Sequence, residues 1–277
     1  MAGAGGQLGR ALVQSLGDRA AWAPERHQLD IADLEAVRAA VARVHPDVVI
    51  NAAAYNKVDA AETAPADALS VNAAGTLHLA RAAAEAGALF VHVSTDYVFD
   101  GAQSRPYGED DPPRPLNAYG VSKRAGEMMV EAVGAPALVV RTSGVFGPGG
   151  SRAKGGSFVD RILERARTGA PLRVVNDQTF SPTYAPDLAE AIIALIDRGA
   201  RGMVHVASEG ACTWYELAVA ALETGGLKAQ VVPIATLDLG LPARRPPYSV
   251  LSTRRYADLG ARPLRPWRAA LADLFAR

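Results

Sequence analysis

The sequence has little of several features that mark particular classes of protein. Its 277 residues include one cysteine, Cys212, so neither an intrachain disulfide nor a cysteine-based zinc site can form. The five histidines are scattered, and none belongs to an HExxH pair. Acidic and basic residues balance at 29 each, so no overall field attracts nucleic acid.

Long apolar runs are also missing. None reaches the roughly 18 residues that a membrane-spanning helix needs, and the N-terminus is rich in glycine where a signal peptide would carry a charged region and an apolar core. We therefore expect a cytoplasmic enzyme with no membrane and no nucleic-acid partner.

The chain alternates between short β-branched runs and longer helical patterns. The runs Val48-Val49-Ile50 and Leu138-Val139-Val140 are apolar on both faces, as in strands covered by helices. This alternation predicts an α/β fold with a doubly wound, parallel, Rossmann-type sheet. Strands are expected at 47–51, 89–94, 137–141, 172–176 and 203–207, and helices at 9–16, 34–44, 71–86, 122–133, 158–168 and 187–196.

The last third of the chain has a different character. Glycine and proline become denser, as in residues 242–247, and the segments are shorter. We expect a dinucleotide-binding domain over residues 1–146, with 178–200 packing back onto it. Residues 147–277 would then form mostly a smaller, C-terminal substrate-binding domain.

A glycine motif opens the chain. Gly3-Ala4-Gly5-Gly6-Gln7-Leu8-Gly9 has the pattern G-x-x-G-x-x-G before an expected helix, where glycines let the backbone approach a pyrophosphate at the helix N-terminus. Arg26 follows an expected second strand, where an arginine can meet a 2′-phosphate; a solvated surface arginine is an equally good interpretation.

The strand that should feed this glycine motif is short. Only Met1 and Ala2 precede Gly3, so we expect the first strand to be truncated. Neighbouring strands would then have unpaired backbone groups, each costing about 1–3 kcal/mol when buried.

A second motif is Tyr119-Gly120-Val121-Ser122-Lys123. Tyr119 and Lys123 are four residues apart and share one face of a helix. A nearby ammonium favours the phenolate, so the pKa of Tyr119 is expected to fall from about 10. Such a tyrosine can pass a proton to a carbonyl oxygen as hydride reaches the carbon.

Polar residues follow two of the expected strands. Ser94 and Thr95 end one strand, and ligands of open α/β sheets bind beyond such carboxyl ends, so Thr95 can contact a substrate oxygen. The alternative is that both hydroxyls only cap the strand. Ala52, Ala53 and Ala54 follow another strand, and their small side chains would let a cofactor lie against the backbone.

Together these segments resemble the dTDP-4-dehydrorhamnose reductase family of the extended short-chain dehydrogenases/reductases. The resemblance covers nearly the whole chain. Its motifs are GAGGQLGR (3–10), PDVVINAAAY (46–55), VDAAE (58–62), STDYVFDG (94–101), PLNAYGVSK (115–123), RTSGVFG (141–147), VVNDQTFSPTYAPDLA (174–189), TWYELA (213–218) and ARRPPYSVLST (243–253).

The resemblance implies NAD(P)H-dependent reduction of the C4 keto group of a dTDP-sugar, with NADPH as cofactor and NADH as the alternative. Tyr119 would donate the proton, Lys123 would hold the nicotinamide ribose, and Thr95 would bind the C4 carbonyl. The remaining cofactor contacts implied are Gly3, Gly6, Gln7, Leu8, Arg26, Asp30, Ile31, Ala52, Ala53 and Ala54. Substrate contacts implied are Val58, Asp96, Tyr97 and Arg245.

Three substitutions depart from the family pattern. Gly144 stands where a tryptophan is usual, Asn56 where a threonine is usual, and Ser157 where an asparagine is usual. One hypothesis is an open space at Gly144, which a tryptophan would fill against the sugar; the alternative is that neighbouring residues already fill it. An epimerase or dehydratase of the same family and a non-catalytic homologue remain alternatives. Thr95-Asp96-Tyr97 argues against a dehydratase, where Thr-Asp-Glu is typical.

Other candidate residues have simpler interpretations. Cys212 is expected to be a small packing residue, and Trp214 and Trp267 are expected to be core or interface aromatics. The acidic run 109–111 is expected to be solvated in its loop. The family is associated with Mg²⁺ and with homodimers, but no ligand set is visible in the sequence, and we predict no metal site.

Overall fold

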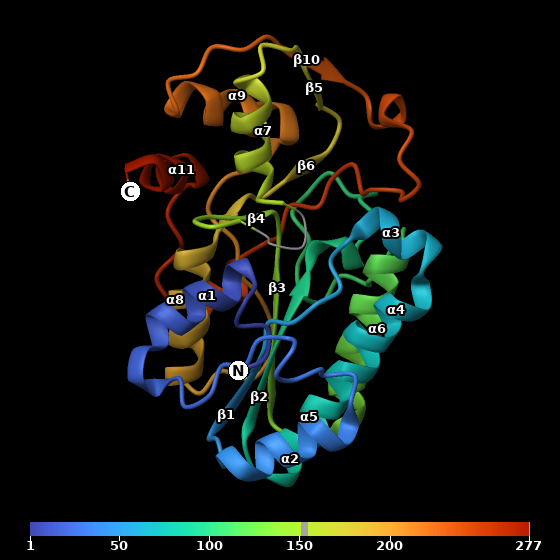
Figure 1. The fold of residues 1–277 in the computed structure, drawn as a ribbon, viewed down its shortest axis with the longest axis vertical. Helices are drawn as coiled ribbons and strands as arrows, with labels where there is room; N and C mark the ends of the chain where they lie inside the picture. The colour runs from blue at the N-terminus through green and yellow to red at the C-terminus, as the bar shows by residue number, and fades with distance from the viewer. Residues whose placement is uncertain (151–154, 277) are drawn as a thin grey trace.

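The computed structural model describes residues 1–150 and 155–276 and contains a parallel central sheet with helices on both faces (Figure 1). Its strands follow the order β1-β2-β3-β8 and all run parallel. They are β1 (Val48–Asn51), β2 (Leu89–Thr95), β3 (Ala137–Thr142) and β8 (Gly202–His205). The predicted doubly wound Rossmann-type fold is therefore confirmed.

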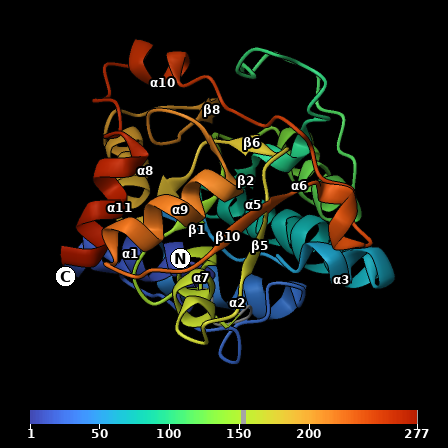
Figure 2. The same cartoon turned by 90° about the horizontal axis from the view of Figure 1, so that it is seen from above.

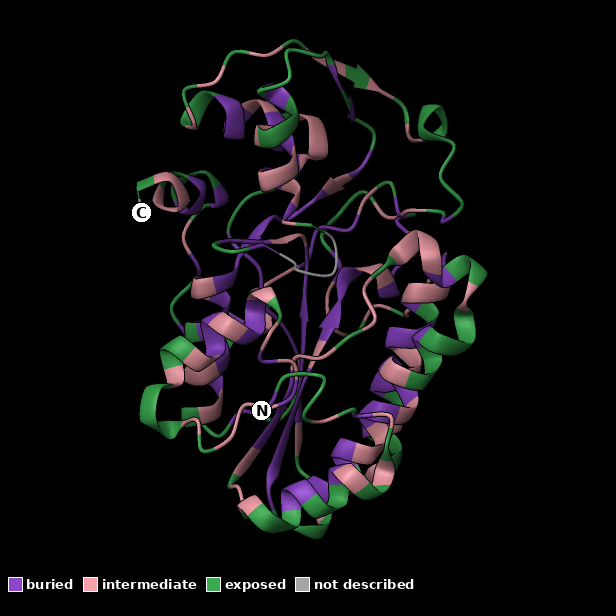
Figure 3. Cartoon of the chain, viewed as in Figure 1, coloured by how far each residue is buried: buried purple, intermediate pink, exposed green. Residues whose placement is uncertain are grey.

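Alternate residues of the strands feed two separate cores, because successive side chains of a strand point to opposite faces. Ile50, Val91 and Leu138 pack with the helices α1 (Gln7–Leu16) and α8 (Ala185–Asp197). Val49 and Phe90 pack on the other face, which is covered by α2 (Leu34–Val44), α5 (Gly75–Glu85) and α6 (Ala118–Val133). In Figure 3 the strands are buried along most of their length between these layers.

A smaller layer lies beyond the carboxyl ends of the strands (Figures 1 and 2). It contains the helices α7 (Phe158–Ala166), α9 (Trp214–Thr224) and α11 (Trp267–Ala276), and the parallel pair β5 (Leu172–Val175) and β10 (Val231–Ile234). The strand expected at 172–176 is thus formed, but it pairs with β10 outside the central sheet.

Short segments join the two layers. Two pairs of two-residue strands form there: β4 (Val145–Phe146) with β7 (Thr183–Tyr184), and β6 (Thr179–Phe180) with β9 (Cys212–Thr213). The other short elements are η1 (Gly17–Arg19), α3 (Val58–Thr63), α4 (Pro65–Leu69), the π turn η2 (Ser70–Ala74), η3 (Asp96–Val98), η5 (Thr236–Leu239) and α10 (Arg254–Asp258). In the described part of the chain, no helix has the length and apolar character needed to cross a membrane.

The residues before Gly3 form a single bridge to β1. The Ala2 amide donates to the carbonyl of Ile50 at 2.8 Å, and the Ala52 amide donates to the carbonyl of Ala2 at 3.0 Å. These two bonds satisfy backbone groups that we expected to be unpaired. The second strand expected before Arg26 is absent: the described residues there form turns and irregular backbone.

Candidate functional site

A cavity of about 1200 Å³ lies between the carboxyl ends of the central strands and the smaller layer. Every site residue that we predicted from the sequence lines it. These are Gly3, Gly6, Gln7, Leu8, Arg26, Asp30, Ile31, Ala52, Ala53, Ala54, Val58, Thr95, Asp96, Tyr97, Tyr119, Lys123 and Arg245. The structure thus brings together residues that are up to 242 positions apart (3 to 245).

The glycine motif forms a close-packed cradle at one end of the cavity. Gly3 has φ +85°, and a β-carbon there would lie 2.5 Å from the carbonyl carbon of Ala52. A β-carbon at Gly9 would lie 2.8 Å from the carbonyl carbon of Gly3. Helix α1 begins at Gln7, and its N-cap residue Gly6 supplies no side-chain acceptor. The first-turn N–H groups are therefore able to bind an anion, which fits the pyrophosphate of a dinucleotide.

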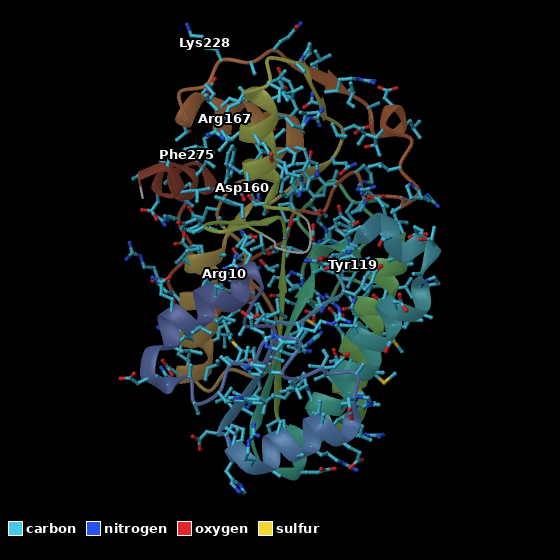
Figure 4. All side chains as sticks on the ribbon, in the orientation of Figure 1. Arg10, Tyr119, Asp160, Arg167, Lys228 and Phe275 are labelled. Atoms are coloured by element: carbon cyan, nitrogen blue, oxygen red, sulfur yellow. The ribbon has the colours of Figure 1, made fainter. Side chains whose placement is uncertain are left out.

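Arg10 fixes this cradle, and sequence reasoning missed it. Its guanidinium donates to the carbonyl of Gly5 at 2.6 Å, and to the carbonyls of Gly149 and Gly150 at 2.8 and 2.6 Å. Figure 4 shows Arg10 on the α1 side of the sheet and Tyr119 on the α6 side. Two of its partners lie 139 and 140 residues away in the sequence, so no local pattern could have revealed this role.

The loop that follows α1 holds the residues expected near the adenosine. The Asp30 carboxylate accepts from the Ala32 amide at 3.0 Å, and this bond closes a turn that contains Ile31. Arg26 is exposed at the rim of the cavity and forms no ion pair with any residue that the structure describes. Its guanidinium is therefore available to an added phosphate.

Tyr119 and Lys123 are placed by the start of α6. The Asn117 side chain caps this helix by accepting from the Gly120 amide at 2.8 Å. The buried Lys123 ammonium group donates to the carbonyl of Val93 at 2.7 Å and lies 3.3 Å from Nε2 of His92. The ring of Tyr119 meets the ring of Tyr97 edge-on, with 5.9 Å between centroids.

The predicted lowering of the Tyr119 pKa is wrong for this structure. Burial raises the pKa of Tyr119 to about 12, and a hydrogen bond with Thr95 opposes that rise only in part. The Lys123 side chain is directed to Val93 and His92 and does not offset the desolvation of the phenol. Burial in turn lowers the pKa of Lys123 to about 8, against the charge of Glu127. Tyr119 is thus a protonated phenol at neutral pH, which suits a proton donor.

Thr95 is held by a buried carboxylate. Its hydroxyl donates to Oδ1 of Asp96 at 3.1 Å, and Oδ2 of Asp96 accepts from Ser143 at 2.7 Å and from Ser249 at 2.5 Å. Burial raises the pKa of Asp96, although these hydroxyls lower it. Sequence reasoning missed Ser143 and Ser249, which come from distant segments. Asp96 therefore positions the hydroxyl of Thr95, and Thr95 lines the cavity.

Basic residues gather toward the smaller layer. The Arg245 guanidinium donates to Asp59 at 2.6 Å, and burial is the main reason that the pKa of the adjacent Tyr97 is raised. Three further arginines line the cavity there and were not singled out from the sequence: Arg161, Arg165 and Arg173. Guanidinium groups suit a diphosphate because their paired N–H donors match its oxygens.

The hypothesis of an open space at Gly144 is wrong. Gly144 has φ +51°, and a β-carbon there would lie 2.5 Å from Cδ2 of Phe180. The Phe180 ring stacks on Trp214 with 3.9 Å between centroids. Phe180 therefore occupies the space that a larger side chain at 144 would need. The other two residues that depart from the family pattern, Asn56 and Ser157, also line the cavity. Ser157 is in addition the N-cap of α7.

The acidic run at 109–111 is bonded, contrary to our expectation of a merely solvated loop. Glu109 accepts from the His205 amide at 2.8 Å, and Asp110 pairs with Arg255 at 3.0 Å. Asp111 pairs with Arg105 at 2.7 Å, which lowers the pKa of Asp111 to about 2. Within residues 1–150 and 155–276 no group of three acidic, histidine or cysteine side chains is arranged to hold a metal ion.

The remaining candidates pack as expected. Cys212 is buried, and burial raises the pKa of its thiol to about 12, so it is a packing residue. Trp267 is buried in the core of the smaller layer. Trp214 packs at the edge of that core, donates to Gln178 at 3.1 Å and also lines the cavity.

The fold and the site define a class. A Rossmann-type sheet with a glycine cradle at one end of a cavity and Thr95, Tyr119 and Lys123 at the other is the arrangement of a short-chain dehydrogenase/reductase. The family model described as the RmlD substrate binding domain matches residues 1–277. The chain belongs to this family, that of the dTDP-4-dehydrorhamnose reductases.

Named relatives match over nearly the full length. A dTDP-4-dehydrorhamnose reductase of Mycobacterium tuberculosis is 46% identical, with 99% of this chain and 91% of the relative covered. The spore coat polysaccharide biosynthesis protein SpsK of Bacillus subtilis is 42% identical, with 98% and 94% covered. The crystal structure of a dTDP-4-dehydrorhamnose reductase from Bacillus anthracis in complex with NADP has a TM-score of 0.95 at 34% identity, with 99% and 97% covered.

Proposed function

We propose that the protein reduces the C4 keto group of dTDP-4-dehydro-L-rhamnose with NAD(P)H to give dTDP-L-rhamnose, a nucleotide-sugar precursor of cell-surface polysaccharides. The observation that carries this proposal is the convergence of Thr95, Tyr119 and Lys123 on one cavity with the glycine cradle. The names of the relatives and the NADP complex of one of them support the same substrate and cofactor.

The residues have distinct roles in this proposal. NADPH, when bound, supplies the hydride that reaches C4 of the sugar. Tyr119, with its pKa of about 12, gives its phenolic proton to the C4 oxygen. Thr95 binds the C4 oxygen by turning its one hydroxyl proton from Asp96 to that oxygen when the sugar binds, and Lys123 holds the nicotinamide ribose.

We also propose the other cofactor and substrate contacts that the family resemblance implies. Gly3, Gly6, Gln7 and Leu8 would hold the pyrophosphate, with Arg26, Asp30 and Ile31 at the adenosine and Ala52, Ala53 and Ala54 along the cofactor. Val58, Asp96, Tyr97 and Arg245 would lie on the nucleotide-sugar side, Asp96 through its hold on Thr95. All of these residues line the cavity.

A related dTDP-4-ketosugar is the second candidate substrate. The observation that favours it is Gly144 in the cavity wall, where the family pattern has a tryptophan and where the buried Phe180 ring leaves no room for one. A different surface against the sugar would change which hydroxyl configuration fits.

The test is a turnover assay with enzymatically prepared dTDP-4-dehydro-L-rhamnose and NADPH, with the product identified by mass and by NMR. We expect NADPH oxidation matched by an equal amount of dTDP-L-rhamnose. Lack of turnover by folded protein that still binds NADPH would favour a non-catalytic homologue. Turnover only with an epimeric ketosugar would favour the second candidate.

A two-domain division, a homodimer and a cytoplasmic location are further proposals. We place the division at residue 146, and the packing of α8 against α1 in one core supports the assignment of 178–200 to the first domain. For the homodimer, Leu69, Val121 and Met128 expose apolar side chains on α4 and α6. Light scattering of the purified protein tests the homodimer.

A further inference from the structure

A chain of buried polar side chains lies behind the catalytic groups. His92, in the middle of β2, has no exposed surface. Its Nε2 is 3.3 Å from Nζ of Lys123, and its Nδ1 is 3.2 Å from Nδ2 of Asn51 at the end of β1. The sequence motifs assign no role to His92 or Asn51, although Asn51 lies within the motif 46–55.

The orientation of the Asn51 amide is fixed by its other partners. Its Oδ1 accepts from the Ala53 amide at 3.1 Å, so the Nδ2 group must face the interior. The Thr76 hydroxyl donates its own proton to the carbonyl of Asn72 at 2.7 Å, so its Oγ1 is an acceptor. One Nδ2 hydrogen of Asn51 is donated to this Oγ1 at 3.2 Å. The other Nδ2 hydrogen points at Nδ1 of His92, which is therefore an acceptor.

The proton of the His92 ring is then placed by elimination. Burial, followed by the charge of Lys123, lowers the pKa of His92 well below its ordinary value, so the ring is neutral and carries one proton. With Nδ1 accepting, that proton is on Nε2 and faces Lys123. An ammonium has no lone pair to accept it, whereas an amine has one.

We propose that His92 is a positioning residue for Lys123: Asn51 holds the ring in its Nε2–H form, which bonds Lys123 only as an amine and so makes it lose its proton far more readily than an exposed lysine. The inference rests on the proposed function for the part that Lys123 plays in turnover. Nζ keeps an N–H donor for the carbonyl of Val93 in either protonation state.

The charged and titratable groups around Lys123 agree with this. On α6, Glu127 and Tyr119 lie one turn away on either side, and Asp96 and Tyr97 of η3 line the same cavity as Lys123. The charge of Glu127 raises the pKa of Lys123, yet burial outweighs it and leaves that pKa at about 8. Glu127 is itself bound by Arg141 through two hydrogen bonds of 2.8 and 2.7 Å, which limits its hold on Lys123.

The reaction gives this arrangement a purpose. After Tyr119 has passed its proton to the C4 oxygen, the phenolate must be neutralised by a proton from solvent. In its ammonium form Lys123 can give one N–H proton to the phenolate, which restores the Tyr119 hydroxyl, and the resulting amine then regains a proton from solvent. Because the Nε2–H of His92 bonds the amine form, it makes that release easier.

The first test uses the wild-type protein with ¹⁵N-labelled histidine and ¹³C-labelled lysine. At pH 9 we expect the His92 ring to show a protonated Nε2 and a bare Nδ1, with the signal assigned by its loss in His92→Gln. The Lys123 signal, one of four lysines, should titrate at least one pH unit below the other three. A ring protonated on Nδ1, or a Lys123 that titrates with the other lysines, would overturn the proposal.

The second test reverses the hydrogen-bond pattern with Asn51→Asp. A carboxylate has no donor, so Nδ1 of His92 must supply the proton, and Nε2 becomes an acceptor for the Lys123 ammonium. We expect the ring to switch to its Nδ1–H form and the Lys123 titration to rise by at least one pH unit. A raised titration with an unchanged ring would show only the added charge and would contradict the proposal.

Neither test depends on turnover. A failed reductase assay with the expected spectra would refute the proposed substrate alone, whereas unexpected spectra with normal turnover would refute the role of His92 alone. If Asn51→Asp does not fold, the wild-type spectra still test the proposal, because they report the protonated nitrogen of His92 and the titration of Lys123.

Discussion

Replacing Glu127 with glutamine tests how the site is anchored to the sheet. Glu127 and Arg141 are 0% and 1% exposed, and the Arg141 guanidinium donates to both carboxylate oxygens at 2.8 and 2.7 Å. Glutamine has nearly the same shape, but it has one acceptor and turns an NH₂ group toward the guanidinium. Removing one partner of a buried pair costs about 3–5 kcal/mol, because it leaves an uncompensated buried charge.

The expected change is large enough to measure by thermal unfolding. Each kcal/mol shifts the Tm of proteins a little smaller than this one by about 2–4 °C, so Glu127→Gln should melt roughly 6–20 °C below the wild type. Glu131→Gln is the matched control, since Glu131 lies one turn away and is exposed. Arg124 donates to Glu131 at 2.9 Å and also to Glu127 at 3.1 Å. We expect this control to change the free energy of unfolding by less than about 1 kcal/mol.

The loss should also depend on pH. Burial pushes the pKa of Glu127 up, but the hydrogen bonds and charge of Arg141 outweigh burial and leave that pKa lowered. A lowered folded-state pKa contributes stability above the unfolded value near ~4.3, and this stability is lost as pH falls through the folded value. The difference between wild type and Glu127→Gln should therefore shrink below a pH of about 4. A variant within about 1 kcal/mol of wild type at pH 7 would refute this account of the pair.

Three further substitutions probe the site itself. Tyr119→Phe should bind NADPH normally and lose about 10²–10⁴-fold in kcat, because only the phenolic proton is removed; wild-type kcat would remove Tyr119 from the mechanism. Arg26→Ala should weaken NADPH binding about tenfold, in line with the loss of one charge-assisted contact of about 1.5 kcal/mol, and leave NADH binding unchanged. Equal losses for both cofactors in calorimetry would place Arg26 away from the 2′-phosphate. Gly144→Trp should lower both the Tm and the sugar affinity, because the tryptophan side chain would meet Phe180 and the backbone at 144 has φ +51°. The double variant Gly144→Trp/Phe180→Ala should recover part of the stability. An unchanged Tm for the single variant would show that Phe180 moves aside.

The parts of the fold that the sequence predicted depend on local patterns. The apolar runs around Val49 and Val139 are typical of strands covered on both faces. The glycines at 3–9 and the pair Tyr119/Lys123 are recognisable because each pattern falls within a few residues at the start of a helix. The family resemblance then added the residues that line the far side of the cavity, such as Arg245.

What the sequence could not predict depends on contacts between distant segments. The partners of Asp96 come from residues 143 and 249, and the direction of the Lys123 side chain is set by the backbone of Val93 and by His92. The Tyr119 pKa was mispredicted for the same reason, since spacing on a helix says nothing about which way the lysine turns. The filled space at Gly144 likewise depends on Phe180, which arrives from another element.

The most direct test of the proposed reaction follows the hydride itself. NADPH carrying deuterium at the transferable C4 position of its nicotinamide is incubated with the protein and dTDP-4-dehydro-L-rhamnose, and the product is examined by NMR. We predict one deuterium at C4 of the sugar in dTDP-L-rhamnose, and none there in the same time with Tyr119→Phe. Oxidation of NADPH without deuterium at C4 of the sugar would contradict the assignment of this cavity as the site of a C4 ketoreductase.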